Sequence, residues 1–165
     1  LEHTSRTDPL TSLANRRAMR ELLAAEVSRA RRHGSPLVVV SLDLDHFKAI
    51  NDTYGHDAGD AVLVQVAAVM ERNLRREDSC GRWGGEEFLM VLPECGLEAS
   101  TNVAEKLRGR IEQATVILGG RTLRVTASIG VATFSVDDSV EDLLRRADDA
   151  MYAAKRGGRN RVVRR

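Results

Sequence analysis

The amino-acid sequence predicts an α+β fold in which helices flank a mainly antiparallel central sheet. Segments whose apolar residues fall at helical spacing are interleaved with short apolar strands. Two of these strands flank a pair of glycines, which is typical of a β-hairpin. The other strands are separated by helices, so segments that are distant in the sequence must meet in one sheet.

The first half is predicted to contain two amphipathic helices around a buried strand. From residue 11 to Gly34, a typical C-cap, apolar residues fall on one helical face: Met19, Leu22, Leu23 and Ala30. Residues 37–45 form a β-branched strand whose end alternates, so Asp43 and Asp45 share one face. Residues 45–49 are expected to form a short helical turn. The second helix spans 58–75, with the buried stripe Leu63, Val66, Ala67, Met70 and Leu74.

The second half is predicted to begin with the hairpin. Its strands are residues 79–82 and 88–92, which flank Gly84 and Gly85. A third helix over 97–112 precedes one long alternating strand over 123–131. A fourth helix over 140–155 and a short strand that includes Val162 and Val163 complete the fold.

Length and composition favour a single domain with no polymeric partner. The 165 residues, 42% hydrophobic and 30% charged, can bury one useful core. The 25 basic and 24 acidic residues nearly cancel, so bulk charge favours neither a nucleic-acid polymer nor a membrane as partner. Cys80 and Cys95 lack CxxC spacing and a paired histidine, which favours two reduced thiols over a disulfide or a zinc site.

The chain has no apolar run that could cross a bilayer and no apolar leader at its start. We therefore expect a cytoplasmic domain without membrane contacts of its own, although missing regions could anchor the full-length protein. Residues 1–7 are expected to be the end of an upstream linker or signalling helix, and residues 8–165 a single folded domain.

Acidic residues gather where predicted strands end. A carboxylate at the end of a buried strand, such as Asp43, is a recurrent way to hold Mg²⁺, although it could also serve only as a strand cap. The glycine pair permits close backbone approach, and a plain turn would suit it equally. A plain turn, however, does not need Glu86 and Glu87 directly after it. These three carboxylates could hold two metal ions that clamp a triphosphate and activate a 3′-hydroxyl.

Basic residues lie close to these acidic segments in the predicted fold. The turn after the first strand offers backbone N–H groups to a phosphate, and Lys48 adds positive charge there. Lys155 and Arg159 flank the glycines that follow the last helix, and both could reach a phosphate. Favourable charge at a helix C-terminus would explain them as well.

Read together, the segments resemble the GGDEF family of diguanylate cyclases over residues 8–160. The matching segments are 8–17 (DPLTSLANRR), 43–48 (DLDHFK), 51–60 (NDTYGHDAGD), 84–88 (GGEEF) and 154–160 (AKRGGRN). Ser12 stands where glycine is usual, outside the expected active site. Five segments in the right order are far more specific than the GGEEF pentapeptide alone. The resemblance implies a fold similar to nucleotide cyclases and polymerase palm domains, with the signature on the hairpin.

The resemblance also implies residue roles. Asp43, Glu86 and Glu87 form the catalytic set, and with the backbone of Leu44 they hold Mg²⁺, two ions per active site, with Mn²⁺ as an alternative. Glu86 is also a candidate base toward the 3′-hydroxyl, and the division of duties between the two glutamates stays open. The implied substrate-binding residues are His46, Phe47, Lys48, Asn51, Asp60, Leu63, Gly84, Gly85, Lys155 and Arg159.

Guanine selectivity is expected from Asn51 and Asp60. A carboxylate can accept hydrogen bonds from guanine N1–H and from its exocyclic amine, whereas adenine presents an acceptor at N1. Asp60 therefore favours GTP over ATP, because mispairing leaves polar groups unsatisfied. Leu63, one helical turn further on, could line the base pocket or belong only to the core.

Residues 75–78 (RRED) have the RxxD form that precedes the signature in family members inhibited by their product. Arg75 can bind guanine O6 and N7 in a fork while Asp78 accepts from the opposite edge, and Arg82 could join them. The alternative is a solvated helix end with a local ion pair.

The implied reaction joins two GTP molecules into cyclic di-GMP and releases two pyrophosphates. A homodimer is needed, since each 3′-hydroxyl attacks the α-phosphate of the GTP on the other domain. The dimer contact and the input signal are expected from an upstream sensory or dimerisation domain. The alternatives are a non-catalytic module that binds GTP or cyclic di-GMP, another nucleotidyl transferase such as an adenylate cyclase, and a structural scaffold.

Overall fold

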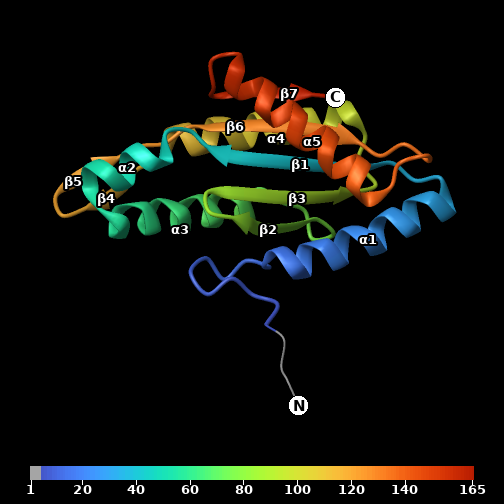
Figure 1. Cartoon of the computed structure of the whole chain (residues 1–165), viewed down its shortest axis with the longest axis horizontal. Coiled ribbons are helices and arrows are strands. Elements are labelled where there is room, and N and C mark those ends of the chain that lie inside the picture. Colours follow the sequence, from blue (N-terminus) through green and yellow to red (C-terminus); the bar gives the residue numbers. More distant parts are fainter. Residues whose placement is uncertain (1–4) are drawn as a thin grey trace.

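The structure is a computed structural model that describes residues 5–165. The upstream segment expected over 1–7 therefore falls largely outside the described residues. The elements in chain order, shown in Figure 1, are α1 Arg16–His33, β1 Leu37–Leu44, α2 Phe47–Tyr54, α3 His56–Arg72, β2 Ser79–Gly84, β3 Glu87–Pro93, α4 Leu97–Gln113, β4 Val116–Leu118, β5 Arg121–Leu123, β6 Ala127–Thr133, α5 Val140–Arg156 and β7 Arg161–Arg164.

The main sheet has five strands in the order β2-β3-β1-β6-β7. The strand β1 lies at its centre and pairs antiparallel with both β3 and β6. The strand β2 pairs antiparallel with β3, and only β6 and β7, joined by α5, run parallel. The expectation of an α+β fold with a mainly antiparallel sheet is confirmed.

Helices cover both faces of the sheet, because the apolar side chains of β1 alternate between them. Val40 and Leu42 pack into the core cluster that includes residues of α3 and α4. Leu37 and Val39 pack into the cluster that includes residues of α1 and α5. The same alternation places Asp43 on the α1 and α5 face of the sheet.

The helix α5 lies unusually close to β6 at Gly130. A Cβ atom at this position would come within 2.2 Å of the Met151 backbone nitrogen and 2.3 Å of the Ala147 carbonyl oxygen. Only a glycine allows this approach of helix backbone to strand. The close packing brings the last turn of α5, with Lys155, to the end of β1 that carries Asp43.

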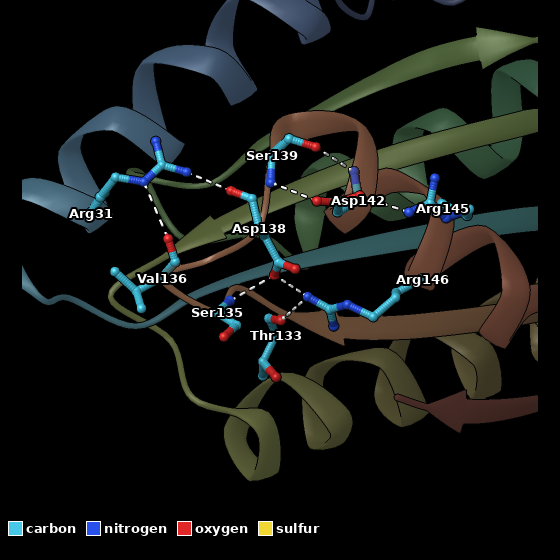
Figure 2. A network of polar contacts seen from close by, with 9 residues as sticks. All are labelled: Arg31, Thr133, Ser135, Val136, Asp138, Ser139, Asp142, Arg145 and Arg146. Carbon is cyan, nitrogen blue, oxygen red and sulfur yellow. Dashed lines mark hydrogen bonds and ion pairs between the residues drawn. The ribbon is translucent and has the colours of Figure 1, made fainter.

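A polar network fixes the loop between β6 and α5 (Figure 2). The Asp138 carboxylate accepts hydrogen bonds from the Ser135 backbone N–H and from Arg146 of α5. Arg31, in the last turn of α1, donates to the backbone carbonyls of Val136 and Asp138. The network therefore joins the end of α1 to the start of α5, where a capping box formed by Ser139 and Asp142 begins the helix.

The structure corrects several predictions of local structure, among them the start of the first helix, which begins at Arg16 and not at residue 11. The strand predicted over 123–131 is broken, since β5 ends at Leu123 and β6 begins at Ala127, and the β4–β5 hairpin was not predicted. At the break, the Thr126 carbonyl accepts from the Asp45 N–H. The turn expected over 45–49 is the start of α2, which continues to Tyr54. The helix predicted over 58–75 ends at Arg72, and Leu22 of α1 is exposed.

Among the described residues, no helix is both long enough and apolar enough to span a membrane. The free cysteines differ in burial, with Cys80 half-buried and Cys95 buried. Burial raises the pKa of the Cys80 thiol to about 12, so this thiol is protonated and unreactive at neutral pH.

Candidate active site

The acidic residues of β1 and the signature hairpin meet at one end of the sheet. Asp43 lies directly opposite Glu87 in the β1–β3 ladder. The Leu44 N–H donates to the Glu86 carbonyl oxygen at 3.2 Å, which holds the hairpin tip against the end of β1. The turn consists of Gly85 and Glu86, because Gly84 pairs with Glu87.

The hairpin turn is shifted by one residue from the glycine pair itself. Gly85 has φ +46°, a left-handed conformation that favours glycine, while Gly84 still belongs to β2. No heavy atom lies within 4 Å of a Cβ built on either glycine, apart from atoms of the adjacent residues. The backbone at Gly84 and Gly85 is therefore open to close approach by a ligand, as the sequence predicts.

Several negatively charged side chains surround Asp43. Its side chain is buried, and burial is the main reason why the pKa of Asp43 is raised. An ion pair with Lys155, at 2.9 Å between Nζ and Oδ1, lowers the pKa. The neighbouring charges of Glu86 and Asp45 raise it.

Glu87 experiences the same crowding of carboxylates. Burial raises the pKa of Glu87, and the negative charges of Asp43 and Asp148 raise it further. Asp148 belongs to α5, two helical turns before Lys155 on a similar face. The site therefore has more carboxylate than cationic charge, which favours a bound cation.

The chemistry of these carboxylates suits a divalent metal ion, although their positions do not form a complete coordination site. In residues 5–165, no three His, Cys, Asp or Glu side chains are placed as a ready metal site. The Oδ1 atom of Asp43 is nevertheless buried and receives no well-aligned hydrogen bond, even from Lys155. Mg²⁺ uses few protein oxygens and takes phosphate oxygens at its remaining positions, so a complete protein cage is not needed.

The helices α2 and α3 bring Asn51 beside the segment that contains Asp60. A Cβ atom at Gly59 would lie 1.9 Å from Asn51 Oδ1 and 3.0 Å from Phe47 Cζ. Asn51 Oδ1 is buried and has no hydrogen-bond partner among the described residues. Asp60 is exposed, whereas Phe47 and Leu63 belong to the core.

The turn after β1 was predicted to offer its backbone N–H groups to a phosphate. One of these groups is instead bonded within the protein. The Asp45 N–H donates to the Thr126 carbonyl at 2.8 Å. His46 has φ +54° and precedes α2 without a side-chain cap. Lys48 is exposed and pairs with Asp52 at 2.7 Å.

The basic residues at the end of α5 and just after it reach the same end of the sheet. Lys155 contacts Asp43 directly, which is more specific than a general attraction to the helix C-terminus. Arg159 is exposed and lies in a left-handed turn with φ +65°. The next residue, Asn160, donates its backbone N–H to Asp45 Oδ2 at 3.0 Å, which connects this turn to the end of β1.

Two residues of this region were not among the predicted site residues. Asp45 accepts hydrogen bonds from Thr126 and Ser128 as well as Asn160, and only its place two residues after Asp43 hinted at a role. Asp148 acts on Glu87, and its helical spacing from Lys155 is the pattern that could have identified it.

Arg75 and Asp78 form a compact ion pair at the start of β2. The Asp78 side chain is only 3% exposed and binds Arg75 Nη2 at 2.8 Å and Nε at 3.2 Å. Arg75 also donates to the Pro93 carbonyl at 2.7 Å. Arg82 lies near the other end of β2 and instead contacts the Gly85 carbonyl at 2.9 Å and Asp8 at 3.4 Å. The structure does not bring Arg82 to this pair.

Comparisons with known proteins agree with the geometry. The family model "Diguanylate cyclase, GGDEF domain" matches residues 5–161. The diguanylate cyclase DgcP of Pseudomonas aeruginosa is 45% identical over 94% of this chain and 23% of its own length. The response regulator PleD of Caulobacter vibrioides is 45% identical over 95% of this chain and 35% of its own length. The chain thus spans between about a quarter and a third of the length of these relatives.

Solved structures show the same fold. The GGDEF domain of DgcB from Caulobacter crescentus, in complex with cyclic di-GMP, has a TM-score of 0.95 and 36% identity, and the match covers 99% of this chain and 95% of that one. The diguanylate cyclase SiaD of Pseudomonas aeruginosa, in complex with its activator SiaC, has a TM-score of 0.95 and 46% identity, with 98% and 62% covered. From the signature hairpin, the acidic strand end and these matches, we conclude that the chain belongs to the GGDEF-domain family of diguanylate cyclases.

Proposed function

We propose that this chain joins two GTP molecules into cyclic di-GMP. The observation that carries the proposal is a meeting of charged residues at one end of the β1–β3 pair. Asp43 of β1 and Lys155 of α5 lie there beside the hairpin that bears the GGEEF signature with Glu86 and Glu87. The relatives that are named diguanylate cyclases support the same activity.

In the proposed mechanism, Asp43, Glu86, Glu87 and the Leu44 backbone would hold divalent cations, two Mg²⁺ or Mn²⁺ ions per active site. Such cations would supply charge neutralisation for the triphosphate and a lower pKa for the attacking hydroxyl. Glu86, at the tip of the hairpin, accepts the proton of the 3′-hydroxyl. The 3′-oxygen forms a bond to the α-phosphorus, the bond from that phosphorus to the bridging oxygen breaks, and pyrophosphate leaves.

The phosphates are held by the basic residues around the strand end. Lys155 lies beside Asp43, where its positive charge offsets the negative charges of the carboxylates and of the triphosphate. Arg159 and Lys48 add charge from the α5 end and the start of α2, with His46 and Phe47 shaping the turn between β1 and α2. Charge-assisted hydrogen bonds to phosphate are stronger than neutral ones, so these contacts orient the α-phosphate for attack.

Guanine is held between α2 and α3. Asp60 accepts from N1–H and the exocyclic amine, and Asn51 contacts the same base from α2. Gly59 permits the close contact between the two helices on which this pocket depends. An ATP molecule would place an acceptor against the Asp60 carboxylate, which disfavours it.

Turnover requires a homodimer, because each chain presents one GTP to the other. We expect an upstream sensory or dimerisation domain to hold two chains together, and the domain itself to work in the cytoplasm without contacting a membrane or a nucleic-acid polymer.

Arg75 and Asp78 are the proposed site for inhibition by cyclic di-GMP. The DgcB complex with cyclic di-GMP supports product binding in this family. Asp78 is fully engaged by Arg75, so the product would have to separate the pair or bind the exposed side of Arg75.

The test is incubation of the chain with GTP and Mg²⁺ at high protein concentration, followed by chromatographic separation of the products. The wild type should form cyclic di-GMP and pyrophosphate in a ratio of one to two, and Glu86→Gln should not. A chain fused to a dimerisation segment controls for weak self-association. GTP binding without product in the fused chain would reject the cyclase and favour the non-catalytic binding module.

A further inference from the structure

Asp45 is a buried carboxylate that is bound by neutral groups. Its side chain accepts hydrogen bonds from Thr126 Oγ1 and Ser128 Oγ, each at 2.7 Å, and from the Asn160 backbone N–H at 3.0 Å. The residue is only 3% exposed. Three of its lone-pair positions are therefore occupied by donors from β6, from the segment before β6 and from the turn after α5. Such a carboxylate is suited to hold segments together rather than to coordinate a metal ion.

The turn bound by Asp45 has an unusual backbone. Arg159 and Asn160 are consecutive non-glycine residues in the left-handed region, with φ +65° and φ +46°. Residues other than glycine disfavour this conformation, and it persists only where surrounding contacts enforce it. The Asp45 carboxylate supplies one such contact, because it accepts the backbone N–H of the second residue of the turn.

The helix α4 supplies a second contact, through the Asn160 side chain. Arg108 Nη1 donates to Asn160 Oδ1 at 2.8 Å, and Asn160 Nδ2 donates to Glu112 Oε2 at 2.5 Å. The turn is therefore held from two sides, by the end of β1 and by α4. Arg159, the first residue of the turn, has no ion pair among the described residues, so its guanidinium is available to a ligand.

We propose that Asp45 is a positioning residue for GTP binding. Through the Asn160 N–H it fixes the turn that carries Arg159, and so it sets the place of the Arg159 guanidinium relative to the β1 end that carries Asp43. The inference rests on the proposed function, since it assumes that Arg159 contacts the triphosphate. It differs from the role of a metal ligand in one testable respect, because it depends on the hydrogen bonds of Asp45 and not on its charge.

Two substitutions separate these roles. In Asp45→Asn, the amide oxygen can take the place of Oδ2 and keep the bonds from Thr126 and Asn160, while the amide nitrogen donates to Ser128 Oγ. In Asp45→Ala, all of these bonds are lost. The readouts are the affinity for a GTP analogue with a methylene group between its α- and β-phosphorus atoms, measured by calorimetry with Mg²⁺, and the hydrogen-exchange protection of the Asn160 amide.

We expect Asp45→Asn to keep most of the affinity and protection. Asp45→Ala should lose the protection and bind the analogue about ten- to a hundredfold more weakly, which is the loss expected for one hydrogen bond to a charged group. In Asp45→Ala/Arg159→Ala, binding should be no weaker than in Arg159→Ala alone, because the first residue acts through the second. Equal losses in Asp45→Asn and Asp45→Ala, or additive losses in the double variant, would overturn the inference.

If Asp45→Ala does not fold, Thr126→Val provides the same cycle with Arg159→Ala. It removes one hydrogen bond to Asp45 with little change of shape, and its smaller loss of affinity must likewise vanish in the Arg159→Ala background. None of these binding measurements requires turnover. A wild-type chain fused to a dimerisation segment that binds the analogue but makes no cyclic di-GMP from GTP would therefore refute the proposed activity while leaving the inference about Asp45 separately testable.

Discussion

Replacing Gly59 by alanine should weaken GTP binding more than it destabilises the fold. A Cβ atom at this position would lie 1.9 Å from Asn51 Oδ1 and 2.9 Å from Asn51 Cγ. The Asn51 side chain must therefore rotate out of its present position, and the Phe47 ring, whose Cζ would lie at 3.0 Å, must shift slightly. Overpacking of this kind costs about 1–3 kcal/mol, and the gain of alanine over glycine within a helix offsets about 0.5–1 kcal/mol of it.

The effect on GTP binding follows from the displaced amide. Loss of one neutral hydrogen bond, together with a buried polar group left unpaired, is worth about 1–3 kcal/mol, or roughly five- to 150-fold in affinity. Calorimetry with the methylene GTP analogue measures the affinity, and urea unfolding measures the stability. The matched control is Gly109→Ala, since a Cβ at Gly109 in α4 meets no atom within 4 Å. That variant should bind normally and be slightly more stable.

Two results would refute the reasoning about Gly59. Unchanged affinity in a folded Gly59→Ala variant would mean that Asn51 does not contact the base. Equal losses of affinity in Gly59→Ala and Gly109→Ala would mean that the effect does not come from the contact with Asn51.

Three further predictions concern selectivity and stability. Asp60→Ser should lower the preference for GTP over ATP, measured as the ratio of the two affinities, and an unchanged ratio would remove Asp60 from the base pocket. Burial opposes ionisation of Asp8, but Thr11 and Arg82 outweigh it and hold the pKa of Asp8 below the usual 3.8. The stabilisation is therefore fully present above the usual value and is lost as the pH falls from about 3.8 through the lower pKa of the folded state, so wild type should lose more stability than Asp8→Asn below about pH 4 in denaturant unfolding. Asp138→Ala should cost about 1–3 kcal/mol of unfolding free energy, because it leaves the Ser135 N–H without its acceptor and removes the carboxylate partner of Arg146, which keeps its bond to the Thr133 carbonyl (Figure 2). The exposed neighbour provides the control as Asp137→Ala, and equal stability of the two variants would show that the network contributes nothing.

The sequence predicted those parts of the fold that local patterns determine. The apolar run before Asp43 and the glycine pair placed β1 and the hairpin correctly, because both follow from side-chain alternation and turn chemistry. The break before β6 was missed because Leu123 and Val125 continue the alternation into the strand while the backbone does not. The Thr126 carbonyl is bound there by Asp45, a tertiary contact that no local pattern contains.

The candidate site was predictable as a set of residues but not as a geometry. Motif order identified Asp43, Glu86, Glu87 and Lys155. The ion pair between Asp43 and Lys155 depends on the approach of α5 to Gly130, which only the folded chain shows. The same holds for Asp45, whose donors come from two other parts of the chain.

The most direct test of the central claim compares Asp43→Asn with Asp137→Asn in a chain fused to a dimerisation segment. Both variants remove one carboxylate with almost no change of volume, but only Asp43 lies opposite the signature hairpin. The rate of cyclic di-GMP formation from GTP is measured over a range of Mg²⁺ concentrations. We predict that Asp137→Asn matches the wild type, and that Asp43→Asn is slower by about a hundredfold or more at every Mg²⁺ concentration. Equal rates for the two variants would contradict the claim that the end of β1 is the catalytic centre.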